Sequence, residues 1–381
     1  MILISYYINL SSMLDIYMKY SLLELDGLMF KKINNIGGGY IMYSFRNDYS
    51  EGAHSRILNA LVETNLEQTE GYSTDCYTQK AIDLLKRKID RDDVDIHLLV
   101  GGTQVNLTAI SAFLRPHQAA IGADTSHINC HETGAIESTG HKVITMKTND
   151  GKLTSDLIQK VVDAHTDEHM VQPKLVYISN STELGTLYTK LELEELHKCC
   201  KRNNLLLYLD GARLGSALLS EENDLTLCDI ANLVDAFYIG GTKNGALFGE
   251  ALVICNNSLK EDFRYSIKQK GGLLAKGRLL GIQFEELFKD DLFFELAKHA
   301  NNMAILLKNA LKEKGYEFLT DSSTNQQFPI LPNDIIKKLS ENYSFNIERV
   351  IDEKYAAIRL VTSWATDESS VLKFIEDLKK M

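Results

Sequence analysis

The sequence of 381 residues predicts an α/β fold, with a large domain on a mostly parallel seven-stranded sheet and a small α+β domain after it. From about residue 55, short apolar runs alternate with helical stretches. Two of these runs lead to a charged residue, as buried parallel strands do where they face a ligand crevice. After about residue 290 the alternation changes to shorter strands interleaved with helices.

Each strand of the large domain is predicted from one apolar run. Helical stretches at residues 103–114, 155–164 and 191–202 separate several of the runs. Strands connected in this way form a largely parallel or mixed sheet that is covered on both faces. The predicted strands are residues 95–100, 119–123, 142–146, 174–179, 205–210, 235–239 and 251–255.

The predicted small domain covers residues 291–381 and follows a large domain over residues 42–290. It begins with a long amphipathic helix at residues 292–314, which Gly315 terminates. Short strands at 316–319, 327–331 and 356–361 and helices at 333–340 and 368–380 complete it. Residues 1–41 differ in composition from the rest of the chain. Their first fourteen residues include no charged residue and do not form a signal-peptide pattern. We interpret this segment as a non-conserved extension or an artefact of start-site choice, with Met42 directly before the first motif.

The composition is that of an ordinary soluble globular protein, with 44% hydrophobic and 24% charged residues. A net charge of -11 argues against a nucleic-acid surface. The six cysteines are scattered and form no CxxC pair, which suits reduced thiols in a cytoplasmic protein. We therefore expect a cytoplasmic protein that binds neither nucleic acid nor membrane.

Asp210 is the last residue of the apolar run at 205–210, and Lys243 follows the apolar run at 235–239. A lysine and a carboxylate at the ends of two such strands are what pyridoxal 5'-phosphate requires. The lysine forms a Schiff base, and the carboxylate keeps the pyridine nitrogen protonated. An ion pair at a strand end is the alternative for Asp210, and a solvated loop lysine is the alternative for Lys243. Four glycines between residues 240 and 249 favour a tight loop that faces a ligand.

Gly102 and Thr103 follow the strand at 95–100 and open a helix. Glycine lets the backbone approach a phosphate, and free N–H groups at a helix start favour an anion. An ordinary strand-to-helix turn is the alternative, and the spacing matches neither the dinucleotide motif nor the P-loop.

His127 and His131 are spaced i, i+4, so on a helix they would share a face and could form a metal pair. No third ligand is evident nearby, and we predict no metal site. We instead expect the His127 imidazole to stack on the cofactor ring. His131 is interpreted as a structural histidine.

Two arginines are candidates for binding a substrate carboxylate. Arg213 could reach the cofactor phenolic oxygen, the substrate carboxylate or only Asp210. Arg359 lies in an apolar strand, where a planar guanidinium suits an amino-acid carboxylate. A structural ion pair is the alternative for Arg359.

The ordered motifs Gly-Gly-Thr, Ser-His-Ile, Asp-Gly-Ala-Arg, Thr-Lys and Ile-Arg-Leu-Val-Thr resemble those of L-threonine aldolases. These are β-eliminating lyases with the aspartate-aminotransferase-like fold (pyridoxal-phosphate fold type I). The resemblance extends from about Tyr43 to the carboxyl end. The motif Asn-Asp-Tyr-Ser from residue 47 and the motif Thr-Ser-Trp-Ala-Thr from residue 362 are similar to those of trypanosomatid threonine aldolases.

The resemblance implies a role for each cofactor-site residue. Lys243 would carry the cofactor, Asp210 would pair with the ring nitrogen, and His127 would stack on the ring. Gly102 and Thr103 would hold the phosphate.

The resemblance also implies how substrate and neighbouring subunits contribute. Arg213, beside the cofactor, and Arg359 would hold the substrate carboxylate. Family members form homodimers or homotetramers with shared active sites. Tyr72 and Asp75 lie where the family places partner-subunit contacts, and Lys270 where a neighbour's basic residue reaches the phosphate.

Two departures from the family pattern concern the substrate. Asn47 stands where many members have a serine that touches the substrate carboxylate. The segment 179–183 lacks the histidine that many members carry near the substrate hydroxyl. The reaction requires a base with a pKa near neutral. This requirement favours His127, or a water that it orients, over Glu183 as the base.

The expected reaction is retro-aldol cleavage of L-threonine or L-allo-threonine to glycine and acetaldehyde. A related β-eliminating lyase and a phenylserine-type aldolase are alternatives. A non-catalytic cofactor-binding or metal-binding protein is an alternative from another class.

Overall fold

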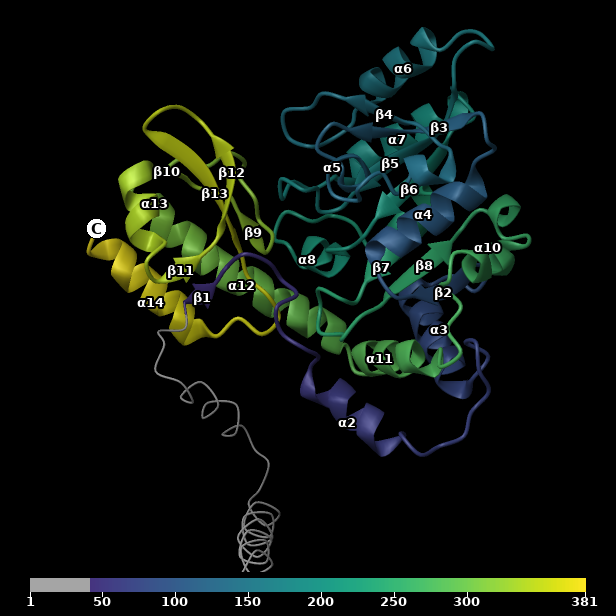
Figure 1. Cartoon of the computed structure of the whole chain (residues 1–381), viewed down its shortest axis with the longest axis horizontal. Coiled ribbons are helices and arrows are strands. Elements are labelled where there is room, and N and C mark those ends of the chain that lie inside the picture. The colour runs from purple at the N-terminus through teal and green to yellow at the C-terminus, as the bar shows by residue number, and fades with distance from the viewer. Residues whose placement is uncertain (1–41) are drawn as a thin grey trace, which may run out of the picture. The chain divides into compact units, whose positions relative to one another are not determined.

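The computed structural model describes residues 42–381, and Ser44–Met381 form one compact unit (Figure 1). The expected extension at residues 1–41 lies outside the described residues. The division into domains at residue 290 stays a prediction. Among residues 42–381, no helix is long and apolar enough to cross a membrane.

A seven-stranded sheet forms the centre of the molecule, as the sequence predicts. Its strand order is β2-β8-β7-β6-β5-β3-β4. Four neighbouring pairs are parallel, and β8 alone runs antiparallel to both of its neighbours, so the sheet is mostly parallel. The strands are β2 (Asp95–Leu99), β3 (Gln118–Ala123), β4 (Val143–Met146), β5 (Gln172–Ser179), β6 (Leu206–Asp210), β7 (Ala236–Gly240) and β8 (Glu250–Ile254).

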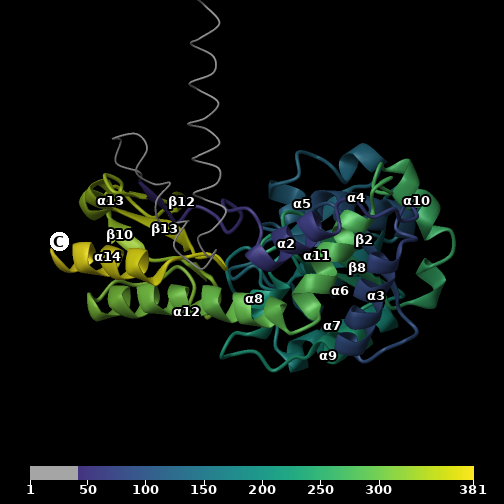
Figure 2. The same ribbon diagram turned by 90° about the horizontal axis from the view of Figure 1, so that it is seen from below.

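Helices cover both faces of this sheet (Figures 1 and 2). In β6, Leu207 and Leu209 pack into the core on one face, whereas Tyr208 between them packs into the core on the other. Such alternation is the two-residue period of a strand that is buried on both sides. One face is covered by α4 (Gly102–Phe113), α5 (His127–Cys130) and α10 (Phe263–Gln269). The other is covered by α2 (Ser55–Glu63), α3 (Cys76–Ile89), α6 (Ser155–Ala164), α7 (Lys190–Arg202), α9 (Leu227–Leu233) and α11 (Arg278–Phe288).

A long helix, α12 (Leu292–Glu313), leads from the large sheet to a second, smaller sheet (Figure 1). It contacts the short helix α8 (Leu214–Leu218) on one side and α14 (Glu368–Lys379) on the other. The second sheet has the order β10-β13-β12, and β9 also pairs with β13. Its strands are β9 (Gln326–Gln327), β10 (Ile330–Pro332), β12 (Asn346–Val350) and β13 (Tyr355–Val361). The remaining elements are β1 (Tyr43–Ser44), β11 (Tyr343–Ser344), α13 (Asn333–Leu339) and the 3-10 turns at Glu137–Thr139 and Asn257–Leu259.

The predicted strand at residues 316–319 is wrong. A single bridge joins Phe318 to Pro329, and no ladder extends from it. The Leu319 amide donates to the Phe328 carbonyl at 2.9 Å, and the Ile330 amide donates to the Glu317 carbonyl at 2.8 Å, so the pairing is confined to this one bridge. The predicted strand at 327–331 is split into β9 and β10, with Phe328 and Pro329 between them. The strand β12 was not predicted, because most of its residues are exposed and it lacks a clear apolar run.

Candidate active site

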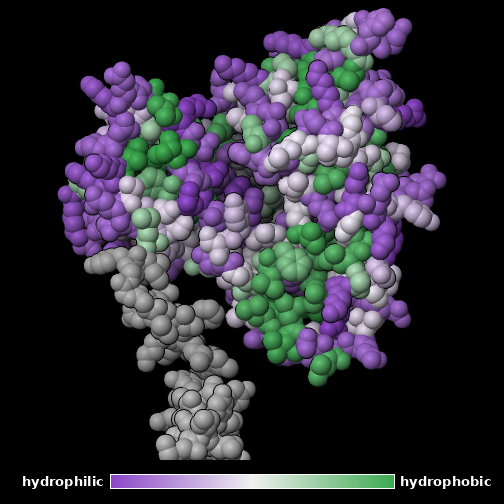
Figure 3. Space-filling view, in the orientation of Figure 1, coloured by the Kyte–Doolittle hydropathy of each residue, from purple (hydrophilic) through white to green (hydrophobic). Residues whose placement is uncertain are grey.

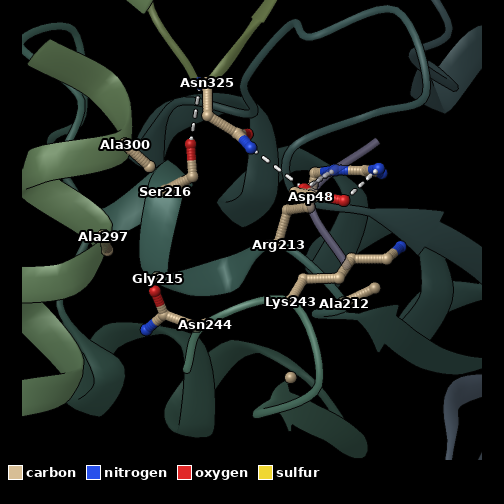
Figure 4. Close-up of a pocket in the computed structure, with 11 residues that line it drawn as sticks. Asp48, Ala212, Arg213, Gly215, Ser216, Lys243, Asn244, Ala297, Ala300 and Asn325 are labelled. Atoms are coloured by element: carbon tan, nitrogen blue, oxygen red, sulfur yellow. Dashed lines mark hydrogen bonds and ion pairs between the residues drawn. The ribbon is translucent and has the colours of Figure 1, made fainter. Parts of the chain in front are cut away.

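Asp210 and Lys243 lie at the same edge of the large sheet. Asp210 is the last residue of β6, and Lys243 follows the end of the neighbouring parallel strand β7. The carboxyl ends of parallel strands are where α/β folds bind ligands. A cavity at this edge is lined by Arg213 and Lys243, by Asp48 from the amino-terminal segment and by Asn325 next to β9 (Figure 4).

The Asp210 carboxylate is buried and receives several hydrogen bonds. The hydroxyl of Tyr177 donates to Oδ2 at 2.5 Å, and the hydroxyl of Tyr238 donates to Oδ1 at 2.5 Å. The Ala212 amide donates to Oδ1 at 3.0 Å. Burial raises the pKa of Asp210, but the nearby His127 charge and these hydrogen bonds outweigh it and lower the pKa below its ordinary value. Asp210 is therefore ionised and can hold a protonated ring nitrogen.

Gly211, directly after Asp210, is required by the neighbouring strand. A Cβ atom at Gly211 would lie 1.8 Å from the carbonyl oxygen of Tyr238 in β7. A Cβ atom at Gly240 would lie 2.3 Å from the carbonyl oxygen of Ala212. The ends of β6 and β7 therefore approach each other too closely for a side chain at either glycine.

The Lys243 amine lies among buried charges. Burial and the positive charge of Arg213 lower the pKa of Lys243 below its ordinary value. Glu250, the first residue of β8, is buried nearby and accepts a hydrogen bond from the Gly241 amide at 3.0 Å. Burial raises the pKa of Glu250 to about 8. A lysine with a lowered pKa is more often neutral, which is the form that attacks a carbonyl carbon.

His127 is the first residue of α5, and a chain of hydrogen bonds connects it to Asp210. Its Nδ1 atom lies 2.8 Å from Oε1 of the buried Glu132. The Asn106 amide donates to that same oxygen at 2.8 Å and to Asp210 Oδ2 at 3.1 Å. Burial lowers the pKa of His127, but the hydrogen bond to Glu132 and the charge of Asp210 outweigh it and raise the pKa. The imidazole is thus held in one orientation and favoured in its charged form.

His131 ends α5 and is exposed. Its ring centroid lies 5.5 Å from that of His127. Burial and the charge of His127 lower the pKa of His131. Among residues 42–381, no group of three or more His, Cys, Asp or Glu side chains could hold a metal ion. The structural role of His131 stays a prediction.

The start of α4 lies at the same edge of the sheet. Gly101 precedes the helix and gives it no side-chain cap, so the first N–H groups of Gly102 and Thr103 remain available. Lys270 follows α10, and its carbonyl oxygen accepts a hydrogen bond from Gln104 Nε2 at 3.4 Å. The Lys270 backbone therefore lies beside the first turn of α4 within the same chain.

Arg213 forms a two-point ion pair with Asp48. Its Nε donates to Asp48 Oδ2 at 2.7 Å, and its Nη2 donates to Oδ1 at 3.1 Å (Figure 4). Asn325 Nδ2 also donates to Asp48 Oδ2, at 2.9 Å. The alternative in which Arg213 pairs only with Asp210 is therefore wrong, because Asp48 occupies the guanidinium.

Arg359 lies in β13, and its Nε atom is buried without a hydrogen-bond partner. Among the described residues, no carboxylate lies within ion-pair distance of it. Burial and the charge of Arg213 lower the pKa of Arg359. Because buried polar groups normally have partners, this donor favours a ligand over the structural ion pair.

Asn47 and Asp75 form local hydrogen bonds. Asn47 Oδ1 accepts hydrogen bonds from the Tyr49 amide and the Ser50 hydroxyl, each at 3.0 Å. The side chain thus stabilises its own turn, and its contact with substrate stays a prediction. Asp75 caps α3 by accepting from the Thr78 amide at 2.8 Å. Tyr72 is exposed, with Lys268 Nζ 4.6 Å from its ring centroid.

Several residues at the site were missed from the sequence. They are buried, and most of them contact partners that are distant in the sequence. Glu132 and Asp48 had a nearby signal, since they directly follow His131 and Asn47. The missed residues are Asp48, Asn106, Glu132, Tyr177 and Tyr238.

These side chains fit pyridoxal phosphate. An ionised buried carboxylate suits the ring nitrogen, and a lysine of lowered pKa suits the aldehyde carbon. The uncapped start of α4 suits the phosphate. The unpartnered Arg359 Nε suits a substrate carboxylate.

Comparison with known proteins agrees with this site. A family model described as beta-eliminating lyase matches residues 56–333. The low specificity L-threonine aldolase of Pseudomonas sp. (strain NCIMB 10558) is 31% identical over 350 residues, which are 88% of this chain and 96% of that protein. That of Escherichia coli (strain K12) is 25% identical over 68% of this chain and 76% of its own length.

Two solved structures show the same fold. The Leishmania major threonine aldolase has a TM-score of 0.88 and 51% identity, covering 89% of this chain and 99% of that chain. A Thermus thermophilus aspartate aminotransferase mutant has a TM-score of 0.67 at 14% identity, covering 89% and 91%. The predicted aspartate-aminotransferase-like fold and the resemblance to trypanosomatid threonine aldolases are confirmed. The chain belongs to the beta-eliminating lyase family and is a pyridoxal-phosphate-dependent lyase.

Proposed function

We propose that this protein cleaves L-threonine or L-allo-threonine to glycine and acetaldehyde. The observation that carries the proposal is the convergence of Asp210, Lys243 and His127 at one sheet edge, with Arg359 Nε left without a partner. The relatives named low specificity L-threonine aldolases support this choice of substrate.

Pyridoxal phosphate, when bound, supplies an electron sink for the pair released from the Cα–Cβ bond. Lys243 would hold the cofactor and yield it to the substrate amine. Asp210, which stays ionised, would keep the ring nitrogen protonated. The imidazole of His127, oriented by Glu132, would lie against the ring.

The arginines would orient the substrate. Arg359 would bind the α-carboxylate through its guanidinium, whose Nε atom has no hydrogen-bond partner within residues 42–381. Arg213, fixed by Asp48, would place a second positive charge beside it. A substrate carboxylate placed by these two arginines would orient the Cα–Cβ bond relative to the cofactor ring. The Cα–Cβ bond is the one that must break.

We further propose a cytoplasmic homodimer or homotetramer with shared active sites. Apolar residues gather over α2 and α11 on one face of the molecule (Figure 3). On and just after α2, Leu58, Val62 and Leu66 are 38%, 77% and 92% exposed. An exposed apolar patch of this kind supports association between copies of the chain.

An aldehyde-release assay tests the function. Purified protein with pyridoxal phosphate would be given L-threonine, L-allo-threonine and phenylserine, with acetaldehyde measured by a coupled dehydrogenase. We expect acetaldehyde from the first two substrates. Benzaldehyde alone would indicate a phenylserine-type aldolase, and ammonia with a keto acid would indicate a β-eliminating activity. A metal-loaded protein that binds no pyridoxal phosphate would overturn the proposal.

A further inference from the structure

Glu183 lies beside His127 in the loop after β5. Its Oε1 atom accepts a hydrogen bond from the Ser179 hydroxyl at 3.0 Å and from the His127 backbone amide at 3.0 Å. Both bonds end on the same oxygen. Within residues 42–381, no other residue donates a hydrogen bond to Oε2, and the Glu183 backbone amide itself interacts with the carboxyl group. One carboxylate oxygen is thus anchored by two other residues, and the second oxygen accepts no hydrogen bond from them.

Charges from several elements face this carboxyl group. They are Asp210 at the end of β6, His127 at the start of α5 and Arg213 before α8. The Tyr177 hydroxyl, in β5, also faces it. Burial and the charge of Asp210 raise the pKa of Glu183 above its ordinary value. Its basicity is therefore greater than that of an exposed glutamate.

His127 is poorly suited to accept a proton. The Glu132 carboxylate lies 2.8 Å from Nδ1 and favours the protonated ring. A protonated imidazole has two N–H donors and no lone pair to accept a proton. When two neighbouring titratable groups have different protonation states, the protonated group can act as the acid and the unprotonated group as the base.

We propose that Glu183, rather than His127, accepts the proton of the substrate β-hydroxyl during cleavage. This inference rests on the proposed function and replaces the expectation that His127 is the base. The free Oε2 atom would take the hydroxyl proton, and the O–H electron pair would form the aldehyde C=O bond. Cleavage of the Cα–Cβ bond would leave an electron pair on Cα, for which bound pyridoxal phosphate would supply the electron sink. A proton from solvent would then add to Cα to give glycine, and Glu183 would release its own proton to solvent.

The assignment accounts for the departure at residues 179–183. The family resemblance implies a histidine in this segment near the substrate hydroxyl, whereas this chain has Thr182 followed by Glu183. A carboxylate of raised pKa can perform the same proton transfer from this loop.

The substitution Glu183→Gln tests the base directly. The glutamine carbonyl oxygen can still accept from Ser179 and from the His127 amide, so the loop keeps its anchors. We expect kcat for L-threonine cleavage to fall by about 100-fold or more, with KM changed little. Protonation of Glu183 should make kcat of the wild type fall at low pH, and this fall should disappear in Glu183→Gln. The fall should remain in Glu183→Asp, since that variant keeps a carboxylate.

Glycine provides a readout that needs no β-hydroxyl base. The exchange of its α-proton with deuterium, followed by NMR, should proceed at the wild-type rate in Glu183→Gln. Infrared spectra of the protein without cofactor should show a carboxylic-acid band that titrates above the ordinary range of a glutamate and is missing in Glu183→Gln. The exposed Glu168→Gln is the matched control and should change none of these measurements.

Two results would overturn the assignment. One is a Glu183→Gln protein that cleaves L-threonine within threefold of the wild-type rate. The other is an equal loss of cleavage and of glycine exchange, which would indicate a structural role. A wild-type protein that exchanges glycine protons but cleaves no β-hydroxy amino acid would instead refute the proposed function, and this assignment with it.

Discussion

The Nδ1 atom of His127 lies 2.8 Å from Oε1 of Glu132, and this oxygen also accepts a hydrogen bond from Asn106. Because Asn106 also donates to Asp210, the imidazole and the carboxylate for the ring nitrogen belong to one network. The network fixes the ring orientation and raises the pKa of His127. A substitution of Glu132 should therefore alter the orientation and the pKa of the His127 imidazole directly.

Glu132→Gln should reduce stability in a pH-dependent way. The pKa of His127 is raised on folding, so its contribution is complete below the unfolded value of about 6.5 and is lost as pH rises through the folded value. Urea unfolding of both proteins across this range should therefore show the largest difference at the acidic end. A difference that grows with rising pH would contradict this account.

Lys243→Ala should abolish covalent attachment of pyridoxal phosphate. Without the amine no Schiff base forms, so borohydride reduction should leave the protein mass unchanged, whereas wild type gains the cofactor. Lys298→Ala is the control, because Lys298 is exposed on α12 and has no role at the site. Reduced cofactor found on Lys243→Ala would move the attachment to another lysine.

Arg359→Lys should weaken substrate binding. A lysine cannot reproduce the planar two-point contact with a carboxylate. A lost hydrogen bond to a charged group corresponds to about 1.5–3 kcal/mol, so KM should rise by about 10- to 100-fold. Steady-state kinetics would check this against Arg349→Lys, an exposed arginine in the neighbouring β12. Equal effects of both substitutions would argue against a carboxylate site.

Gly211→Ala should be strongly destabilising. The added methyl would lie 1.8 Å from the carbonyl oxygen of Tyr238, a backbone atom that cannot rotate away. We expect a loss of about 3 kcal/mol or more in the free energy of unfolding. Gly101→Ala is the control, since its Cβ would meet no atom within 4 Å. Denaturant unfolding that ranks the two alike would show that β7 can move.

The order of secondary structure could be predicted closely. Each of the seven predicted strands appears in the large sheet, with ends shifted by at most two residues. Buried parallel strands have continuous apolar sequences, so their local signal is strong. The signal fails in the smaller sheet, where β12 is largely exposed and the pairing of Phe318 is limited to one bridge with Pro329.

The sequence by itself determined the α/β class, the apolar strands and the placement of Asp210 and Lys243 at strand ends, because these depend on local periodicity. Only the tertiary structure decided which groups surround them. Strand order joins β6 to β7, and Asp48 meets Arg213 across 165 positions of sequence. Asn106 and Asp210 meet across 104 positions. Such contacts depend on how distant elements pack, so the charges of Arg213 and Asp210 that shift the pKa values of Lys243 and Glu183 could not be read from the sequence near them.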